Sequence, residues 1–123
     1  MTESAPAHLP ASLDDATAEH YLRRIDVEPP ASADLASLTL LMRAHLVAVP
    51  FENLDVFHLR PVSTALDWSI PKIVGQGRGG WCFELNGTFG ALLQTLAFDV
   101  RYLGAAVLPV SYTHLTLPTT PYV

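Results

Sequence analysis

The only cysteine of the chain, Cys82, lies in a segment whose residue types suit nucleophilic chemistry. Residues 78–86 read Arg-Gly-Gly-Trp-Cys-Phe-Glu-Leu-Asn, so an arginine and two glycines precede the thiol. A helical pattern follows it, and a thiol at the first turn of a helix lies beside unpaired backbone N–H groups and the positive end of the helix dipole. Both favour the thiolate, which is the nucleophilic form of cysteine. The segment therefore predicts covalent catalysis at Cys82.

The helix after Cys82 is predicted from the spacing of its apolar residues. Gly87 and Gly90 lower its helix propensity and indicate close packing against another element. The alternative interpretation of Cys82 is a buried structural thiol, because free cysteine is among the most buried residue types. The Arg-Gly-Gly approach and the helix start favour the nucleophile. The apolar stripe, which repeats as one face of a helix, consists of Leu85, Phe89, Leu92, Leu93 and Leu96.

Two earlier helices must position this segment. Ser12 and Asp15 form a capping-box pattern that predicts a helix over residues 12–24. Either Ser32 or Asp34 can cap a second helix. We expect this helix to end before Pro50, because proline cannot continue a helix. The predicted apolar faces are Ala18, Tyr21, Leu22 and Ile25 in the first helix, and Leu35, Leu38, Met42, His45 and Leu46 in the second.

The remaining segments carry weaker patterns. We expect residues 51–71 to form an irregular connector, residues 72–74 a short helical turn, and residues 98–103 a strand. The glycine-rich residues 75–80 lack the Lys-Ser/Thr ending of a phosphate-binding loop, so they more plausibly allow a tight turn before the cysteine.

The composition of the chain argues against several classes of protein, among them nucleic-acid-binding, secreted and membrane proteins. Half of the 123 residues are hydrophobic, 15% are charged, the net charge is −5 and the mean hydropathy is +0.27. No basic patch predicts nucleic-acid binding, and neither a signal peptide nor a membrane-spanning run is predicted. A single cysteine excludes an internal disulfide and fits the reducing cytoplasm. Zinc-ligand spacing is absent, so no metal is expected at the scattered residues His8, His20, His45 and His58.

Residues 78–86 resemble the active-site motif of the arylamine N-acetyltransferases, in which this sequence surrounds the acyl-accepting cysteine. Residues 49–55, Val-Pro-Phe-Glu-Asn-Leu-Asp, resemble the Pro-Phe-Glu-Asn-Leu segment of the family, preceded by a leucine-rich helix with a histidine, His45, at its end. Weaker matches occur at residues 21–25 and 96–101. The resemblance covers about residues 13–108, in order and without large gaps.

This resemblance implies an α+β enzyme with a cysteine-protease-like fold, of which this chain is the mainly α-helical front part. Residues 12–97 would form the helical domain with the cysteine motif, and residues 98–108 the first strand of a truncated β-barrel. Residues 1–11 are expected to be a disordered tail. Residues 109–123 are rich in Thr and Pro and contain no charge, which suits either a strand pair or sequence that is not native to the gene.

The resemblance also implies a reaction. An acetyl group would pass from acetyl-coenzyme A, the co-substrate, to Cys82 and then to an arylamine or arylhydrazine. Family members use a Cys–His–Asp triad, and His114 is the candidate histidine because Thr-His-Leu matches the character of that strand. The triad aspartate is absent, since no acidic residue follows Asp99. We therefore expect the chain alone to be inactive.

Three further residues are candidates near the site. Glu52 and Arg78 belong to the two best-matched motifs and carry opposite charges, so they are predicted to hold two loops together. Phe51 is a candidate for substrate binding, whereas Phe83 is predicted to lie in the core. Two rival functions stand: a cysteine hydrolase of the papain or transglutaminase type, against which residues 49–55 argue, and a non-catalytic truncated fragment.

Overall fold

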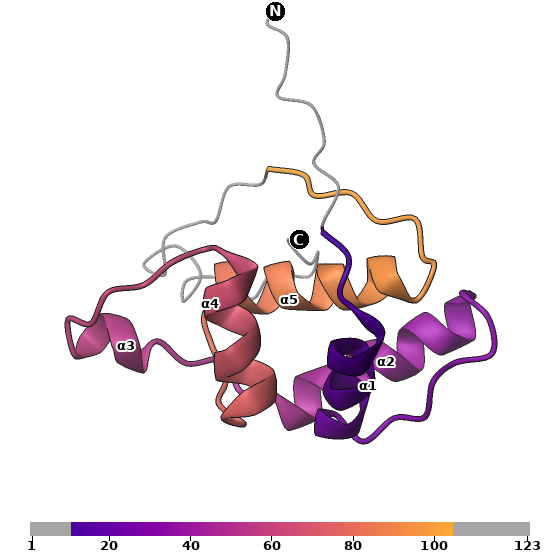
Figure 1. Cartoon of the computed structure of the whole chain (residues 1–123), viewed down its shortest axis with the longest axis horizontal. Helices are drawn as coiled ribbons and strands as arrows, with labels where there is room; N and C mark the ends of the chain where they lie inside the picture. Colours follow the sequence, from indigo (N-terminus) through magenta and orange to yellow (C-terminus); the bar gives the residue numbers. More distant parts are fainter. Residues whose placement is uncertain (1–10, 105–123) are drawn as a thin grey trace, which may run out of the picture.

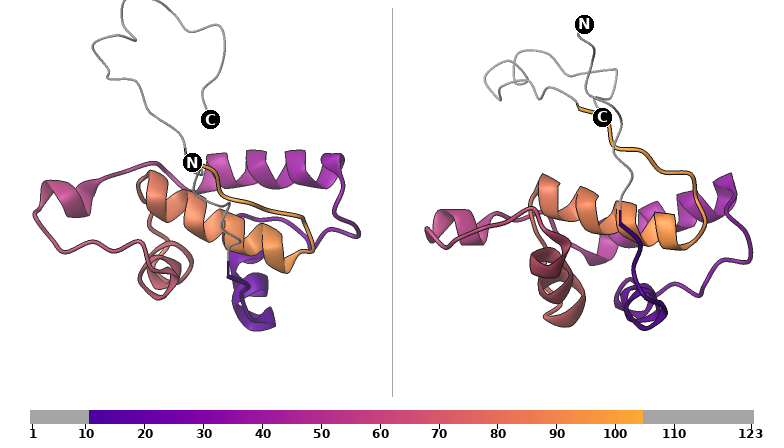
Figure 2. Two further views of the ribbon diagram at one scale, coloured as in Figure 1. Left: turned by 90° about the horizontal axis from the view of Figure 1, so that it is seen from above. Right: turned by 45° about the horizontal axis from the view of Figure 1, so that its top comes forward.

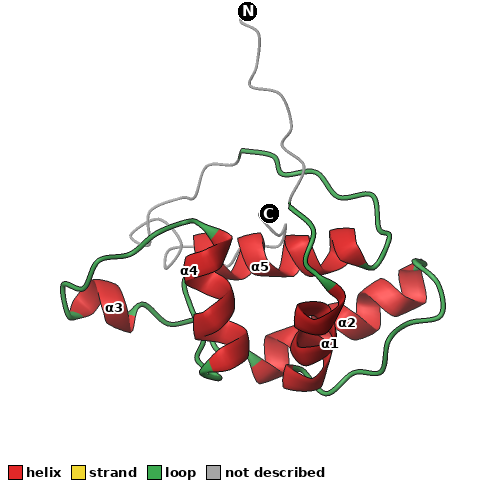
Figure 3. Ribbon diagram, viewed as in Figure 1, coloured by secondary structure: helices red, strands yellow, loops and turns green. Residues whose placement is uncertain are grey.

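Helices and loops make up the whole described part of the chain (Figures 1 and 3). The computed structural model describes residues 11–104, and no strand occurs among them. This agrees with the expectation of a mainly α-helical fragment. The elements are α1 (Asp15–Arg24), α2 (Leu35–Ala48), α3 (Leu54–Phe57), α4 (Leu66–Ile70), the π-helical turn η1 (Pro71–Gly75) and α5 (Cys82–Thr95).

Helix α5 occupies the centre of this arrangement. Seen from above, α5 lies between α2 on one side and α1 and α4 on the other, while α3 projects away from the body (Figure 2). The apolar core fills the space where α1, α2, η1 and α5 meet, which places the predicted stripe of α5 against its neighbours. The largest fully buried apolar side chains are Tyr21, Leu41, Ile73 and Leu92.

Aspartate residues cap the N-termini of α1 and α2. The carboxylate of Asp14 accepts a hydrogen bond from Thr17 N at 2.7 Å, so α1 is capped by Asp14 and not by the predicted pattern at Ser12. Of the two residues that could cap α2, Asp34 does so, accepting from Ser37 N at 2.9 Å. In both cases a carboxylate satisfies a free N–H group of the first turn.

The predicted apolar face of α2 was partly wrong. His45 is buried as expected, but Leu35 and Leu46 are 77% and 72% exposed. The buried stripe instead runs through Leu41, His45 and Val49, at intervals of four residues. Because α2 is apolar on nearly every side, spacing alone does not select the face that packs.

Two short helices, α3 and α4, lie within residues 51–71, which were expected to be irregular. The helical turn expected over residues 72–74 forms as part of η1. Residues 98–104 form no strand, so the strand predicted over residues 98–103 was wrong in the part of the chain that the structure describes. Residues 105–108 lie outside that part, and the start of a β-barrel there stays a prediction. Most of the predicted N-terminal tail and all of residues 109–123 also lie outside it.

A buried polar network crosses the core between α1, α2 and α5. The Tyr21 hydroxyl lies 2.7 Å from His45 Nε2 and donates a hydrogen bond to Thr88 Oγ1 at 3.0 Å. The His45 ring also packs on Phe89, with 4.6 Å between centroids. Burial, and secondly the positive charge of Arg24, lower the pKa of His45 to about 4. The imidazole is therefore neutral in the folded protein at neutral pH.

This network predicts acid sensitivity. The unfolded chain protonates His45 near pH 6.5, whereas the folded protein does so only near pH 4. Between these values the unfolded state binds more protons, so the free energy of unfolding falls as the pH is lowered, by on the order of 2–3 kcal/mol. Urea titrations followed by circular dichroism measure this slope.

The matched variants are His45→Gln, which removes the buried imidazole, and His20→Gln, which removes an exposed one. We expect the slope between pH 6.5 and pH 4 to shrink only in His45→Gln. An unchanged slope in that variant would contradict the assignment.

Candidate active site

Cys82 is the first residue of α5, and its side chain is exposed. The thiol lies at the edge of an apolar cavity of about 300 Å³ between α2 and α5. Phe51, the predicted substrate-binding residue, lines the same cavity. A nucleophile at this position can therefore meet a bound aromatic molecule. The full lining is Met42, His45, Leu46, Val49, Phe51, Cys82, Leu85, Asn86 and Phe89.

The loop before Cys82 pairs with the segment that follows α2. Phe51 and Gly80 form a parallel bridge, in which Glu52 N donates to Gly80 O at 2.9 Å and Gly80 N donates to Pro50 O at 3.1 Å. A Cβ atom at Gly79 would overlap the Pro50 carbonyl oxygen. The two best-matched motifs of the sequence are thus in direct backbone contact, and glycine is required where they approach most closely.

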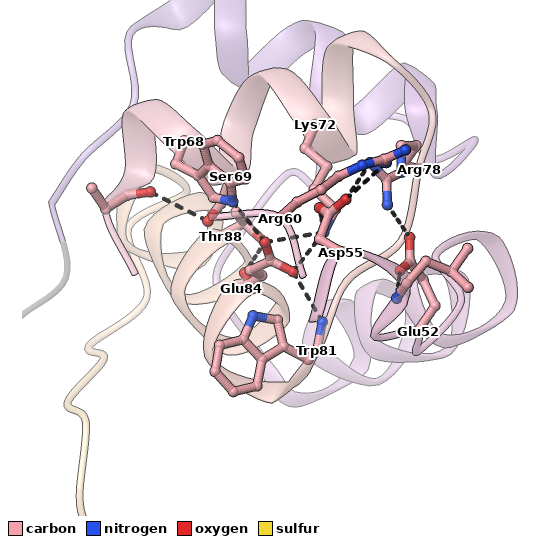
Figure 4. A network of polar contacts seen from close by, with 12 residues as sticks. Glu52, Asp55, Arg60, Trp68, Ser69, Lys72, Arg78, Trp81, Glu84 and Thr88 are labelled. Atoms are coloured by element: carbon pink, nitrogen blue, oxygen red, sulfur yellow. Dashed lines mark hydrogen bonds and ion pairs between the residues drawn. The ribbon is translucent and has the colours of Figure 1, made fainter. Parts of the chain in front are cut away.

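Arg78 reinforces this contact through its side chain. Its guanidinium lies 3.1 Å from Glu52 Oε2 and 3.3 Å from Asp55 Oδ1 (Figure 4). Asp55 is buried, and hydrogen bonding from Lys72, with a further contribution from Arg78, holds the pKa of its carboxyl below the usual value. Glu52 and Arg78, which the sequence singled out, are therefore an ion pair between the two loops.

A second, fully buried ion pair lies beneath α5. Lys72 Nζ, from η1, is 2.9 Å from both Glu84 Oε1 and Asp55 Oδ2. Glu84 has no exposed surface, and its other oxygen accepts from Trp68 Nε1 at 2.9 Å. Sequence reasoning missed this pair. Two signals could have found it: Lys72 is the only lysine of the chain, and Glu84 is the third helical residue after Trp81, where a capping-box glutamate lies.

Arg24 fixes the other end of the loop. Its guanidinium donates to the carbonyl oxygens of Ile73 and Ala48, both at 2.9 Å, and of Gly77 at 3.0 Å. Gly77 has φ +67°, a left-handed conformation that favours glycine. One side chain of α1 therefore ties together the end of α2, the turn η1 and the approach to the cysteine.

Not every predicted residue takes its expected place. Phe83 is 58% exposed and stacks edge-on against Trp81, because it lies off the buried stripe of α5; the prediction that it belongs to the core was wrong. His114 lies outside the described residues. Within residues 11–104, no side chain hydrogen bonds to the Cys82 thiol.

The described part of the chain also lacks two other features. No group of three metal-binding side chains occurs within residues 11–104. None of the helices described is long and apolar enough to cross a membrane.

Comparison with known proteins gives consistent matches. A family model described as N-acetyltransferase matches residues 34–120. An arylamine N-acetyltransferase of Escherichia coli is 44% identical over 92 residues, covering 72% of this chain and 32% of the relative. That of Mycolicibacterium smegmatis is 35% identical over 99 residues, covering 80% and 36%. A pineal gland isozyme of Gallus gallus is 42% identical over 74 residues, covering 60% and 26%. The chain thus spans about a third or less of these relatives.

The loop-to-loop ion pair generates a prediction. We expect Glu52→Ala and Arg78→Ala each to lower the free energy of unfolding by roughly 1–3 kcal/mol, less than for a fully buried pair, since the Arg78 side chain is 29% exposed. Arg78→Ala costs more, because Asp55 also loses a partner. A double-mutant cycle, measured by urea unfolding, gives the coupling.

The exposed pair Asp99 and Arg101, at 3.8 Å, is the control for this cycle. Its coupling is expected to be close to zero. Equal coupling in the two cycles would show that Glu52 and Arg78 do not brace the loops.

Proposed function

Because the chain belongs to the arylamine N-acetyltransferase family, we propose that the whole protein transfers an acetyl group from acetyl-coenzyme A to an arylamine or arylhydrazine through a thioester on Cys82. The observation that carries the proposal is the exposed thiol of Cys82 at the first turn of α5, beside an apolar cavity. The names of the relatives supply the arylamine as acceptor, and the arylhydrazine follows from the resemblance to the family.

The proposed reaction has two covalent steps. The Cys82 thiolate attacks the acetyl carbonyl carbon and a bond forms between that carbon and the Cys82 sulfur. The bond from the same carbon to the coenzyme A sulfur breaks, and coenzyme A leaves as its thiol after taking a proton. The acceptor nitrogen then attacks the thioester, the carbon–sulfur bond breaks, and Cys82 regains a proton while the nitrogen loses one. Free enzyme and acetyl-enzyme alternate, so the kinetics are ping-pong.

Both steps are favoured by an apolar pocket beside the thiol. Apolar side chains such as Phe51 and Phe89 line the cavity and suit a flat aromatic acceptor. An apolar wall also limits hydrolysis of the thioester by water. The bridge between Phe51 and Gly80 holds the cavity wall in a fixed position relative to the loop that carries the nucleophile.

The proposal also includes the general base, the co-substrate and the cellular compartment. We assign His114 the role of removing the thiol proton, on the resemblance to the family triad alone. Acetyl-coenzyme A is the co-substrate, and no metal, nucleic acid or membrane takes part. The cytoplasm suits a reaction that depends on a free thiol.

Replacing the nucleophile tests the proposal. In a full-length protein, Cys82→Ser is expected to lower acetyl transfer to an arylamine by more than about 1,000-fold, because a hydroxyl is far harder to ionise than a thiol. Thermal unfolding is expected to stay unchanged, since the side chain is exposed. Turnover retained by a folded Cys82→Ser protein would refute the assignment.

The 123-residue chain tests the role of the base. We expect iodoacetamide to alkylate its exposed Cys82, but no multiple turnover with acetyl-coenzyme A and an arylamine. The reason is that the family triad also includes an aspartate that orients the histidine, and no acidic residue follows Asp99 in this chain. Turnover lost on His114→Ala would instead identify His114 as the base in this chain.

A further inference from the structure

The buried ion pair joins Lys72 of η1 to Glu84 (Figure 4), which lies in the first turn of α5, two residues after Cys82. We infer that Lys72 and Glu84 are positioning residues, which hold the backbone of the nucleophile in its reactive orientation. The inference rests on the proposed role of Cys82.

Glu84 connects the ion pair to the backbone next to the nucleophile. Its Oε1 atom accepts a hydrogen bond from Trp81 N at 3.1 Å and from Lys72 Nζ at 2.9 Å. Its Oε2 atom accepts from Trp68 Nε1 at 2.9 Å and again from Lys72, at 3.1 Å. Trp81 immediately precedes Cys82, so a rotation of the first turn would break the bond to Trp81 N.

The same carboxylate also packs against Gly80, the residue before Trp81. A Cβ atom at Gly80 would fall 2.5 Å from Glu84 Oε1, so a side chain there would have to displace this carboxylate. Gly80 in turn forms the bridge with Phe51, which lines the cavity. Glu84 therefore fixes the loop before Cys82 and the turn after it with respect to the cavity wall.

Lys72 prevents Glu84 from moving alone. Its ammonium group lies between Glu84 and Asp55, at 2.9 Å from each, and its side chain is only 6% exposed. Asp55 also binds Arg78, two residues before Gly80. A displacement of Glu84 would thus disturb the ion pairs of Lys72 and, through Asp55, the contact with Arg78.

Energetics separate a positioning role from a stabilising one. A buried ion pair seldom repays its desolvation, and apolar residues of similar volume often give equal or higher stability. A pair with a purely structural role can therefore be replaced by apolar side chains without loss of function, because Asp55, the other partner of Lys72, keeps its ion pairs with Arg78 and Arg60. A pair that aims the Trp81 N–H group cannot, because no apolar side chain accepts that hydrogen bond.

The experiment compares two double variants of the full-length protein. Lys72→Met with Glu84→Leu fills the space with apolar groups, and Lys72→Gln with Glu84→Gln keeps an oxygen that can accept from Trp81 N. The control, Glu19→Gln with Arg23→Gln, neutralises an exposed ion pair on α1. The readouts are thermal unfolding, kcat and KM for acetyl transfer, and the rate of Cys82 alkylation by iodoacetamide at one pH.

We expect the apolar pair to fold, yet to lose about 10–100-fold in kcat with little change in KM. Its alkylation rate falls roughly 2- to 5-fold, the size expected when a thiolate loses alignment with a helix terminus. The glutamine pair recovers most of both rates, and the control matches the unmodified protein. Apolar variants with unchanged kcat and alkylation would overturn the inference.

Two further outcomes distinguish a failure of this inference from a failure of the variant to fold and from a failure of the proposed function. Should the apolar pair not fold, a loss of more than about 10-fold in both rates in a folded glutamine pair overturns the inference. Should the unmodified protein transfer no acetyl group, the proposed function fails. The alkylation rates then decide the positioning role alone, with equal rates in all variants counting against it.

Discussion

The carboxylate of Glu84, which has no exposed surface and pairs with Lys72, is the constraint on which the described part of the chain depends. A buried charge is tolerated only with charged or hydrogen-bonding partners. Here α4 supplies Trp68, η1 supplies Lys72, and the loop before α5 supplies the N–H group of Trp81. Because those partners come from three segments, one buried charge sets where α4, η1 and the cysteine loop lie against α5.

The sequence predicted the features that local chemistry determines. The cysteine helix was recovered from its apolar stripe, the start of α2 from Asp34 and its end from Pro50, whereas the cap of α1 is Asp14 and not the predicted Ser12. Capping and proline effects act within a few residues of the chain, so they are readable without the fold. The family was also recognised, because residues 49–55 and 78–86 are specific motifs, and the matches to N-acetyltransferases confirm it.

Features that depend on distant residues were not predicted. Burial of Leu41 in place of Leu35 is decided by what packs on α2, not by spacing within α2. The ion pair of Lys72 with Glu84 joins side chains 12 positions apart, and a sequence does not tell a buried charge from a solvated one. The short helices α3 and α4 lack the length at which periodicity becomes visible.

Arg24 has a consequence for the order of folding. Its acceptors lie 24, 49 and 53 residues further along the chain, at Ala48, Ile73 and Gly77. Contacts so far apart form slowly, because a long stretch of chain must be closed before they can stabilise anything. During synthesis α1 emerges from the ribosome first. The hydrogen bond from Arg24 to Gly77 cannot form until residue 77 has also emerged. The loop that carries the thiol therefore takes its shape late, after the helices that flank it.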